Sequence, residues 1–322
     1  QQRKAETFTV SPLHSGSYQL GYRKTREYGG GSAPPGDGIS LGTAVTISGA
    51  AASPNMGYHS SPALAFLMTL FNARLGWWLG NPGPAGNDKY FSFLHSYNRS
   101  GPRFALRPIL TEALGHSDNT HPYVYLSDGG HFENLGLYEM VLRRSHLIVV
   151  ADGSQDPKSR FEDLAGAVRK IRIDLGIPID FIGGMPIYAK DDKDHKDDAR
   201  YYAVGLIRYS CADRDTSGNS ARDGVIIYIK PAITGGEPVD ILNYASTSAA
   251  FPHESTADQN YTEQQLESYR ALGSHVVQTI CGVSPRPLPL MADDADNLIK
   301  YAYYKLPAAM QPTELKSRFG IS

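Results

Sequence analysis

The residues whose types and spacing could do chemistry are concentrated in the segment YLSDGGHFENLGLYE, residues 125–139. Here Asp128 follows a short run of aromatic and β-branched residues and precedes Gly129 and Gly130. An acid in this place could act as a general base, because ligands in open α/β sheets gather outside the carboxyl ends of the strands. Asp-Gly-Gly is also a common turn sequence, in which the aspartate bonds its own backbone. On spacing alone the turn is the more frequent explanation.

Other chemical motifs are less specific. The charged run AKDDKDHKDDAR, residues 189–200, contains possible metal ligands in Asp191, Asp194, His195 and Asp197. The lysines interspersed among them favour a solvated loop instead. The sequence has no H-E-x-x-H motif, Walker loop or dinucleotide fingerprint, which argues against a zinc hydrolase, a nucleoside triphosphatase and a Rossmann enzyme.

The elements that must position the acid alternate between strand and helix. Residues 123–127 and 146–154 are short apolar runs typical of strands, and residues 132–144 between them have helical spacing. A second amphipathic pattern over residues 161–176 predicts a helix, and the apolar run 177–184 predicts the next strand. Strands buried on both faces and separated by amphipathic helices predict the α/β class, with a mostly parallel central sheet and helices on both faces.

The flanking segments are expected to complete a single domain over residues 1–322. Residues 1–40 are rich in Gly, Pro and Tyr and are predicted to be irregular. Residues 61–80 predict a buried helix that ends at a Gly-Asn-Pro sequence and is too interrupted for a bilayer span. Residues 185–236 predict an insertion made of a charged loop and a β-hairpin. A last helix is predicted from Thr262, where T-E-Q-Q forms a capping box.

The composition excludes a strong net electrostatic field around the whole protein. The chain has 322 residues, 41% hydrophobic and 20% charged, and 31 basic against 33 acidic residues give a formal charge of -2. Attraction to nucleic acid or to anionic headgroups would therefore have to be local. Two cysteines are too few for a disulfide framework, which favours a reducing compartment and a cytoplasmic or membrane-associated location. Because the sequence begins with Gln1 and has no basic-then-apolar leader, we expect it to be a piece of a longer protein.

The longer run LSDGGHFENLGLYEMVLRR resembles the aspartate motif of patatin-like phospholipases, in particular that of a group of large bacterial patatin-related proteins. The small-residue segment TAVTISGAAASPNMGYHSSPAL, residues 43–64, is similar to the segment between the serine and aspartate motifs of that family. Residues 148–176 and 251–273 also resemble the bacterial group. The resemblance covers most of residues 40–282.

The resemblance implies a three-layer patatin-like sandwich and a Ser-Asp dyad, in which a serine in a G-x-S-x-G elbow attacks the acyl carbonyl and Asp128 takes its proton. It also implies a lipid or phospholipid ester substrate, no metal or organic cofactor, peripheral contact with a membrane, and no nucleic-acid partner. Five residues are implied to contact the substrate: Ser53, Pro54, His59, Gly129 and Gly130.

The nucleophile itself is missing, since no serine has glycine both two residues before and two residues after it. The family places the serine and the oxyanion loop before the aspartate, so the resemblance implies that a preceding segment of the same protein supplies them. A free aspartate with a pKa of about 3.9 is a poor base for a hydroxyl. The site must therefore raise the proton affinity of the acid or hold the two groups in direct contact.

These observations lead to one main hypothesis and two alternatives. The main hypothesis is a serine acyl-ester hydrolase completed by an N-terminal part, with Asp128 as its base. The alternatives are a non-catalytic lipid-binding or protein-interaction module on the same scaffold, and acyl transfer to an acceptor other than water. His59, His131 and His253 could carry protons or contact substrate, but a Ser-Asp dyad requires no histidine, and structural roles are favoured for them.

Overall fold

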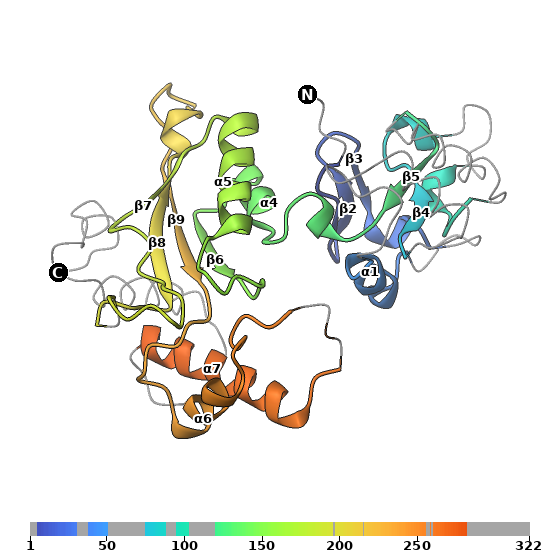
Figure 1. Cartoon of the computed structure of the whole chain (residues 1–322). Coiled ribbons are helices and arrows are strands. Elements are labelled where there is room, and N and C mark those ends of the chain that lie inside the picture. Colours follow the sequence, from blue (N-terminus) through green and yellow to red (C-terminus); the bar gives the residue numbers. More distant parts are fainter. Residues whose placement is uncertain are drawn as a thin grey trace, which may run out of the picture. The chain divides into compact units, whose positions relative to one another are not determined.

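A computed structural model describes residues 5–30, 38–50, 75–87, 95–102 and 120–281, apart from residues 196, 215, 256, 257 and 259. The chain divides into two compact units, residues 1–136 and residues 137–322 (Figure 1). Each unit has strands of its own, whereas the sequence predicts one domain over residues 1–322.

Both units mix strands and helices. The described residues form three sheets and five α-helices. The α/β class is therefore confirmed in general terms, while the patatin-like arrangement of layers stays a prediction.

The first sheet of unit 1 is antiparallel, in the order β1-β2-β3. Its elements are β1 (Thr9–Val10), β2 (His14–Ser17) and β3 (Gly21–Lys24), followed by the 3-10 helix η1 (Thr25–Glu27). The prediction that residues 1–40 are irregular is wrong for this part of the chain. Gly16 is needed for the pairing, because a Cβ there would lie 2.1 Å from the Gly21 carbonyl oxygen of the next strand.

The second sheet of unit 1 pairs two antiparallel strands, β4 (Trp77–Gly80) and β5 (Tyr123–Leu126). Strand β5 confirms the strand predicted before Asp128. Strand β4 shows that the helix predicted over residues 61–80 is wrong at its carboxyl end. Pairing with β5 favours a strand over a helix here, since the Trp78 and Tyr125 rings meet edge to face with their centroids 5.3 Å apart.

Helix α1 and two 3-10 helices also belong to the described part of unit 1: α1 (Leu41–Ser48), η3 (Pro84–Gly86) and η5 (Ser96–Asn98). Ser40 caps α1, its Oγ accepting a hydrogen bond from the Thr43 N–H at 3.0 Å. The helix contributes Ile47 to a core that also contains Leu79 of β4. Tyr28 lies in this core as well, and its hydroxyl donates to the Gly80 carbonyl oxygen at 2.8 Å.

Unit 2 is built on one four-stranded sheet in the order β6-β9-β8-β7. The strands are β6 (Leu147–Ala151), β7 (Ile179–Phe181), β8 (Tyr202–Ile207) and β9 (Gly224–Ile229). The predicted hairpin is confirmed, because β8 and β9 pair antiparallel from Tyr202 opposite Ile229 to Ile207 opposite Gly224. Among the described strands of this sheet β6 and β9 alone run parallel, so the prediction of a mostly parallel sheet is wrong for the part that the structure describes. The hairpin places an antiparallel pair in the middle of the sheet.

Four helices accompany this sheet: α4 (Leu137–Leu142), α5 (Glu162–Leu175), α6 (Val239–Thr247) and α7 (Glu263–Cys281). Helix α5 lies across one face of the sheet, and α6 and α7 lie beyond the end at which β6 and β9 terminate (Figure 1). Helix α5 confirms the amphipathic pattern, with Leu164, Ala167 and Ile171 buried.

Of two predicted helix starts, one is confirmed and the other is wrong. The capping box before α7 is confirmed, because the Gln265 N–H donates to Thr262 Oγ1 at 3.2 Å and Gln265 Oε1 accepts from the Thr262 N–H at 3.4 Å. The helix expected from Phe132 is wrong in its first turn. A 3-10 turn and Gly136, whose φ is 66°, delay α4 until Leu137.

Candidate functional site

The acid singled out in the sequence lies in a tight turn directly after β5. Asp128 precedes the 3-10 helix η6 (Gly129–His131), and its Oδ1 accepts a hydrogen bond from the Gly130 N–H at 2.8 Å. Among the residues that the structure describes, Asp128 Oδ2 has no hydrogen-bond or ion-pair partner, and the residue is partly exposed. The turn thus fixes one carboxylate oxygen and leaves the other open to accept a proton.

The two glycines of the turn differ in what they tolerate. A Cβ on Gly129 would meet no atom within 4 Å. A Cβ on Gly130 would lie 2.3 Å from Asn134 Oδ1 and 3.3 Å from Asp128 Oδ1. A side chain at Gly130 would therefore displace the Asn134 amide and press on the Asp128 carboxylate, whereas one at Gly129 would meet open space.

His131 lies at the end of the same turn. Its Nδ1 is 2.8 Å from Ser127 Oγ, and both residues are partly exposed. The turn brings a hydroxyl and an imidazole together at positions i and i+4, next to Asp128. A hydroxyl in hydrogen-bond contact with an imidazole can be a nucleophile with its base, or a structural pair.

The remainder of the loop is held by buried groups. Glu133 is 8% exposed, and its Oε1 accepts from the Leu135 N–H at 2.5 Å. Phe132 is 6% exposed. These contacts hold the segment that follows the Asp128 turn.

A second Asp-Gly turn follows β6, and the sequence interpretation did not single it out. Asp152 Oδ1 accepts from the Ser154 N–H at 2.8 Å, the same contact to residue i+2 as in the Asp128 turn. Asp152 Oδ2, however, lies 3.2 Å from Lys230 Nζ and 2.5 Å from the Tyr228 hydroxyl. Because β6 and β9 are parallel neighbours, the residues that follow them lie together at the same end of the sheet.

The Asp152–Lys230 pair is buried, and its polar atoms have hydrogen-bond and ion-pair partners within the protein. Asp152 is 2% exposed and Lys230 0%. Burial raises the pKa of Asp152, but hydrogen bonds from Ser154 and Tyr228 and the charge of Lys230 outweigh it, so the pKa lies below its usual value. Lys230 also donates to the Ser154 carbonyl oxygen and to Ser154 Oγ, each at 3.3 Å. The carboxylate is thus ionised, with its charge taken up by the ammonium group.

Two further groups border the pair. His253 is 5% exposed, and its Nδ1 has no hydrogen-bond partner among the described residues. Burial and the charge of Lys230 lower the pKa of His253, so its imidazole is neutral at neutral pH. Asp156 Oδ2 lies 4.0 Å from Lys230 Nζ and accepts from the Phe161 N–H at 2.8 Å. Since Asp152, Lys230, His253 and Asp156 are all at least nine-tenths buried, they brace the loops after β6 and β9 and are closed to a substrate in this arrangement.

A sequence signal for this cluster does exist. Asp152 ends the apolar run LIVVA, and Lys230 ends the apolar run GVIIYI. Opposite charges at the ends of two buried strands predict an ion pair if the strands are parallel neighbours. The sequence does not show that they are neighbours, because β7 and β8 intervene along the chain.

The other predicted residues divide into those outside the description and those in the charged loop. Ser53, Pro54 and His59 lie outside the described residues. In the loop, Asp191 pairs with Lys158 at 2.8 Å and His195 lies 3.2 Å from Asp192. In the described ranges, no group of three His, Cys, Asp or Glu side chains is arranged to hold a metal ion.

One residue of the charged run is anchored to the fold. Lys190 Nζ donates to the carbonyl oxygens of Ala245, of Ser248 at 2.8 Å and of Phe251 at 3.3 Å. It therefore supplies donors to carbonyl groups in and after the last turn of α6. No helix within the described residues is both long and apolar enough to cross a bilayer.

Comparison with known proteins adds no relative: no protein-family model, curated protein or solved structure matches the chain.

Proposed function

We propose that the chain carries the catalytic aspartate of a patatin-like serine acyl-ester hydrolase, which acts on phospholipid or another lipid ester. The observation that supports this best is the carboxylate of Asp128, in which one oxygen is hydrogen-bonded and the other is open. Its Oδ1 is fixed by the Gly130 N–H at 2.8 Å, and its Oδ2 has no partner among the described residues. A general base needs a fixed orientation and an open lone pair, and this carboxylate has both.

The proposed chemistry uses this carboxylate as its base. Asp128 Oδ2 accepts the proton of a serine hydroxyl as the serine Oγ attacks the acyl carbonyl carbon. The proton then passes to the leaving alcohol as the ester bond breaks, and an acyl-serine remains. Asp128 next accepts a proton from water, whose oxygen attacks the acyl-serine, and the proton returns to the serine as the fatty acid leaves. The serine, its oxyanion donors and the remaining layers of a patatin-like sandwich would come from a preceding segment.

A second candidate uses only residues of this chain. Ser127 Oγ lies 2.8 Å from His131 Nδ1, which is hydrogen-bond distance for a nucleophile and its base. In this version Ser127 forms the acyl-enzyme and His131 relays the proton. It requires no preceding segment, so the two candidates make opposite statements about which serine is modified.

Labelling with a fluorophosphonate probe, followed by peptide mapping, tests the proposal on the longest natural form of the protein. We expect label on a serine that precedes the chain, and a fall in ester turnover of about 10²-fold or more in Asp128→Asn. Ser127→Ala is expected to retain both label and turnover. Asp194→Asn, a change at an exposed aspartate in the charged loop, is the matched control.

Each other outcome overturns the proposal in favour of a named alternative. Label on Ser127 that disappears in Ser127→Ala supports the Ser127–His131 candidate. No labelled serine, together with turnover that is unchanged in Asp128→Asn, leaves the non-catalytic lipid-binding module. Turnover that appears only with an added alcohol acceptor identifies acyl transfer.

A further inference from the structure

The end of the unit 2 sheet opposite to Asp152 presents a surface of arginines. Helix α5 leads into β7, where Ile179 pairs with Ile207, and Ile207 in turn pairs with Gly224. The last turns of α5 and the loop 208–223 therefore lie at the same end of the sheet. Four exposed arginines belong to this surface, which we call the arginine end: Arg169, Arg172, Arg214 and Arg222.

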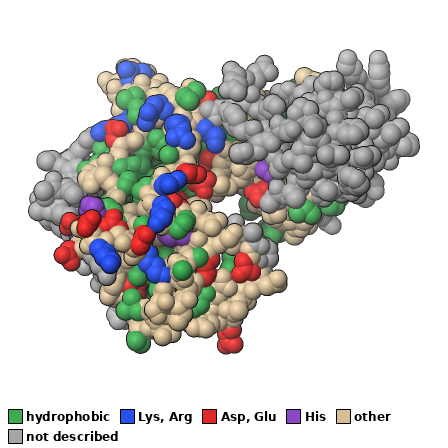
Figure 2. All heavy atoms as spheres, viewed as in Figure 1, with side chains coloured by type: hydrophobic (Ala, Val, Ile, Leu, Met, Phe, Trp, Pro, Cys, Tyr) green, Lys and Arg blue, Asp and Glu red, His purple; other side chains and the backbone are tan. Residues whose placement is uncertain are grey.

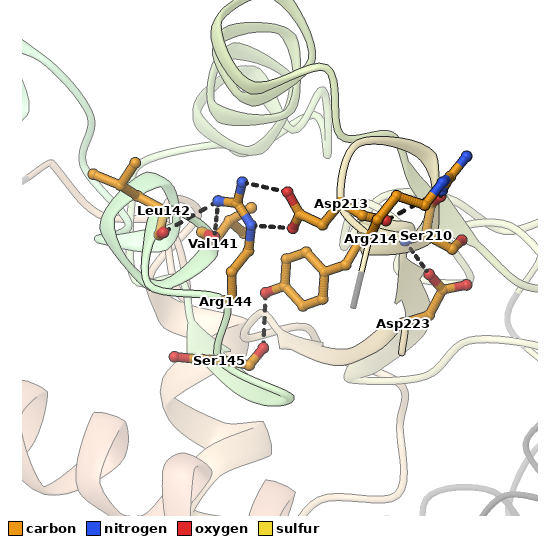
Figure 3. Close-up of polar contacts among 9 residues, drawn as sticks. Val141, Leu142, Arg144, Ser145, Ser210, Asp213, Arg214 and Asp223 are labelled. Carbon is orange, nitrogen blue, oxygen red and sulfur yellow. Dashed lines mark hydrogen bonds and ion pairs between the residues drawn. The ribbon is translucent and has the colours of Figure 1, made fainter. Parts of the chain in front are cut away.

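Three acids at this end, Asp180, Asp213 and Asp223, pair with other arginines, and Asp174 of α5 accepts from the Tyr138 hydroxyl at 3.2 Å. Asp213 receives two hydrogen bonds from Arg144, at 2.5 Å and 3.1 Å (Figure 3). Arg208 occupies both Asp180, at 2.9 Å, and Asp223, at 3.2 Å. These pairs hold the loop 208–223 in place, and in the described part of the chain its other arginines, Arg214 and Arg222, have no carboxylate partner.

The arginine end keeps its positive charge as a result. Among the described residues, Arg169, Arg172 and Arg222 form no ion pair. Arg214 donates to the Ser210 carbonyl oxygen at 2.8 Å and to Ser220 Oγ at 3.1 Å, both uncharged groups. Lys and Arg side chains gather on the upper part of the face seen in Figure 2, over α5.

An apolar side chain stands among these charges. Ile173 is 75% exposed and lies on the outer face of α5, one turn after Arg169 and next to Arg172. Exposed isoleucine has a favourable place at a lipid interface, where its side chain enters the acyl boundary while arginines contact headgroup phosphates. An exposed isoleucine among arginines is better suited to contact with an anionic membrane than to exposure to water.

We propose that the arginine end docks the protein onto a membrane that contains anionic lipids. The choice of a lipid surface over other polyanions rests on the proposed function, since a lipid hydrolase must reach its substrate in a bilayer. The formal charge of -2 gives no general attraction to such a surface, so the attraction has to come from a local patch. Four arginines that have no carboxylate partner among the described residues, beside one exposed isoleucine, provide it.

Vesicle flotation with the whole protein tests this docking surface. Vesicles of phosphatidylcholine with about 30% phosphatidylserine are compared with pure phosphatidylcholine, at low salt and at about 0.5 M salt. We expect binding to the anionic vesicles alone, weakened by salt. Arg169→Gln with Arg172→Gln should reduce partitioning by at least tenfold, at about fivefold per arginine, and Ile173→Ser should reduce the binding that persists at high salt.

The matched control is Arg160→Gln with Lys193→Gln. It removes the same charge from exposed side chains near the opposite end of unit 2 and should leave binding unchanged. Equal loss in the control and the test variant, or equal binding to neutral vesicles, overturns the proposal. Binding to RNA that exceeds binding to anionic vesicles identifies a nucleic acid as the partner and overturns it also.

Failure of this proposal is distinguishable from failure of the proposed hydrolase. Hydrolysis of a soluble short-chain ester does not require docking, so it should be the same in the arginine variants and in the unaltered protein. Vesicle binding does not require a nucleophile, so it should survive Asp128→Asn.

Discussion

The turns at Asp128 and Asp152 are nearly the same in sequence and differ in what surrounds them. Each aspartate follows an apolar strand and precedes glycine, and each Oδ1 accepts from the N–H of residue i+2 at 2.8 Å. The difference lies in Oδ2. In Asp152 it is bound by Lys230 and Tyr228, whereas in Asp128 it has no partner among the described residues.

The comparison teaches that the motif fixes a carboxylate but does not decide its use. A doubly bound, buried Oδ2 serves an ion pair within the fold, because its charge is already neutralised. On the partly exposed Asp128, an Oδ2 without a partner among the described residues keeps its capacity to accept a proton from another group. The second oxygen is therefore the feature that separates a structural aspartate from a candidate base.

Breaking the ion pair should have the largest effect. Lys230→Met keeps the length of the side chain and leaves the buried carboxylates of Asp152 and Asp156 without their cation, so we expect a loss of about 3–5 kcal/mol in the free energy of unfolding. Urea unfolding measures it. Lys158→Met is the matched control, since Lys158 pairs with Asp191 at 2.8 Å on the surface, with side chains 61% and 70% exposed. It should cost far less than Lys230→Met, because solvent screens this exposed pair, and equal losses in the two variants would contradict the interpretation.

The same amide substitution in the two turns should separate them. Asparagine keeps an oxygen for the i+2 N–H in both places. Asp152→Asn leaves Lys230 buried without a full counter-charge and is expected to cost about 3 kcal/mol. Asp128→Asn should change stability by no more than about 0.5 kcal/mol. Thermal unfolding at one pH compares them, and a large loss in Asp128→Asn would show that its Oδ2 has a structural role after all.

The free energy of unfolding should depend on pH through His253, which borders the buried Asp152–Lys230 pair. Burial and the charge of Lys230 lower the pKa of this histidine. The unfolded chain binds a proton at an imidazole pKa of about 6.5, and the folded protein binds it only at lower pH. The unfolded state therefore holds more protons as the pH falls through that value, and the free energy of unfolding decreases.

We expect this loss to reach about 1 kcal/mol between about pH 7.5 and pH 5.5. It should be absent in His253→Gln and retained in His14→Gln, which alters an exposed histidine of unit 1. Urea unfolding at several pH values provides the measurement. The lowered pKa of Asp152 adds a separate loss only below its ordinary value of 3.8, so the two windows do not overlap. An unchanged slope in His253→Gln would assign the pH dependence to other groups.

Local patterns predicted much of this fold because their signals lie within a few residues. The strand before Asp128, the amphipathic helix α5, the β8–β9 hairpin and the capping box at Thr262 all rest on contacts between near neighbours in sequence. The strand β4 could not be found in this way, because its partner β5 is distant in the chain and its Trp-Trp-Leu sequence also suits a helix.

The candidate site was partly predictable for the same reason. The position of Asp128 after a strand follows from the local sequence, and so does its turn. The state of its second oxygen depends on which other elements approach it, as Lys230 approaches Asp152 from a strand that follows two others along the chain. Such long-range neighbours leave no periodic trace in the sequence.

The smallest expected effects concern the two glycines and test how closely the Asp128 turn is packed. Gly129→Ala meets open space and should change the melting temperature very little. Gly130→Ala places a Cβ 2.3 Å from Asn134 Oδ1, so the amide must move, at an expected cost of about 1 kcal/mol. Because the same Cβ lies 3.3 Å from Asp128 Oδ1, ester turnover should fall in Gly130→Ala and persist in Gly129→Ala. Equal turnover in the two variants would show that the fixed oxygen of Asp128 tolerates displacement, and orientation by the turn would then contribute nothing to the proposed base.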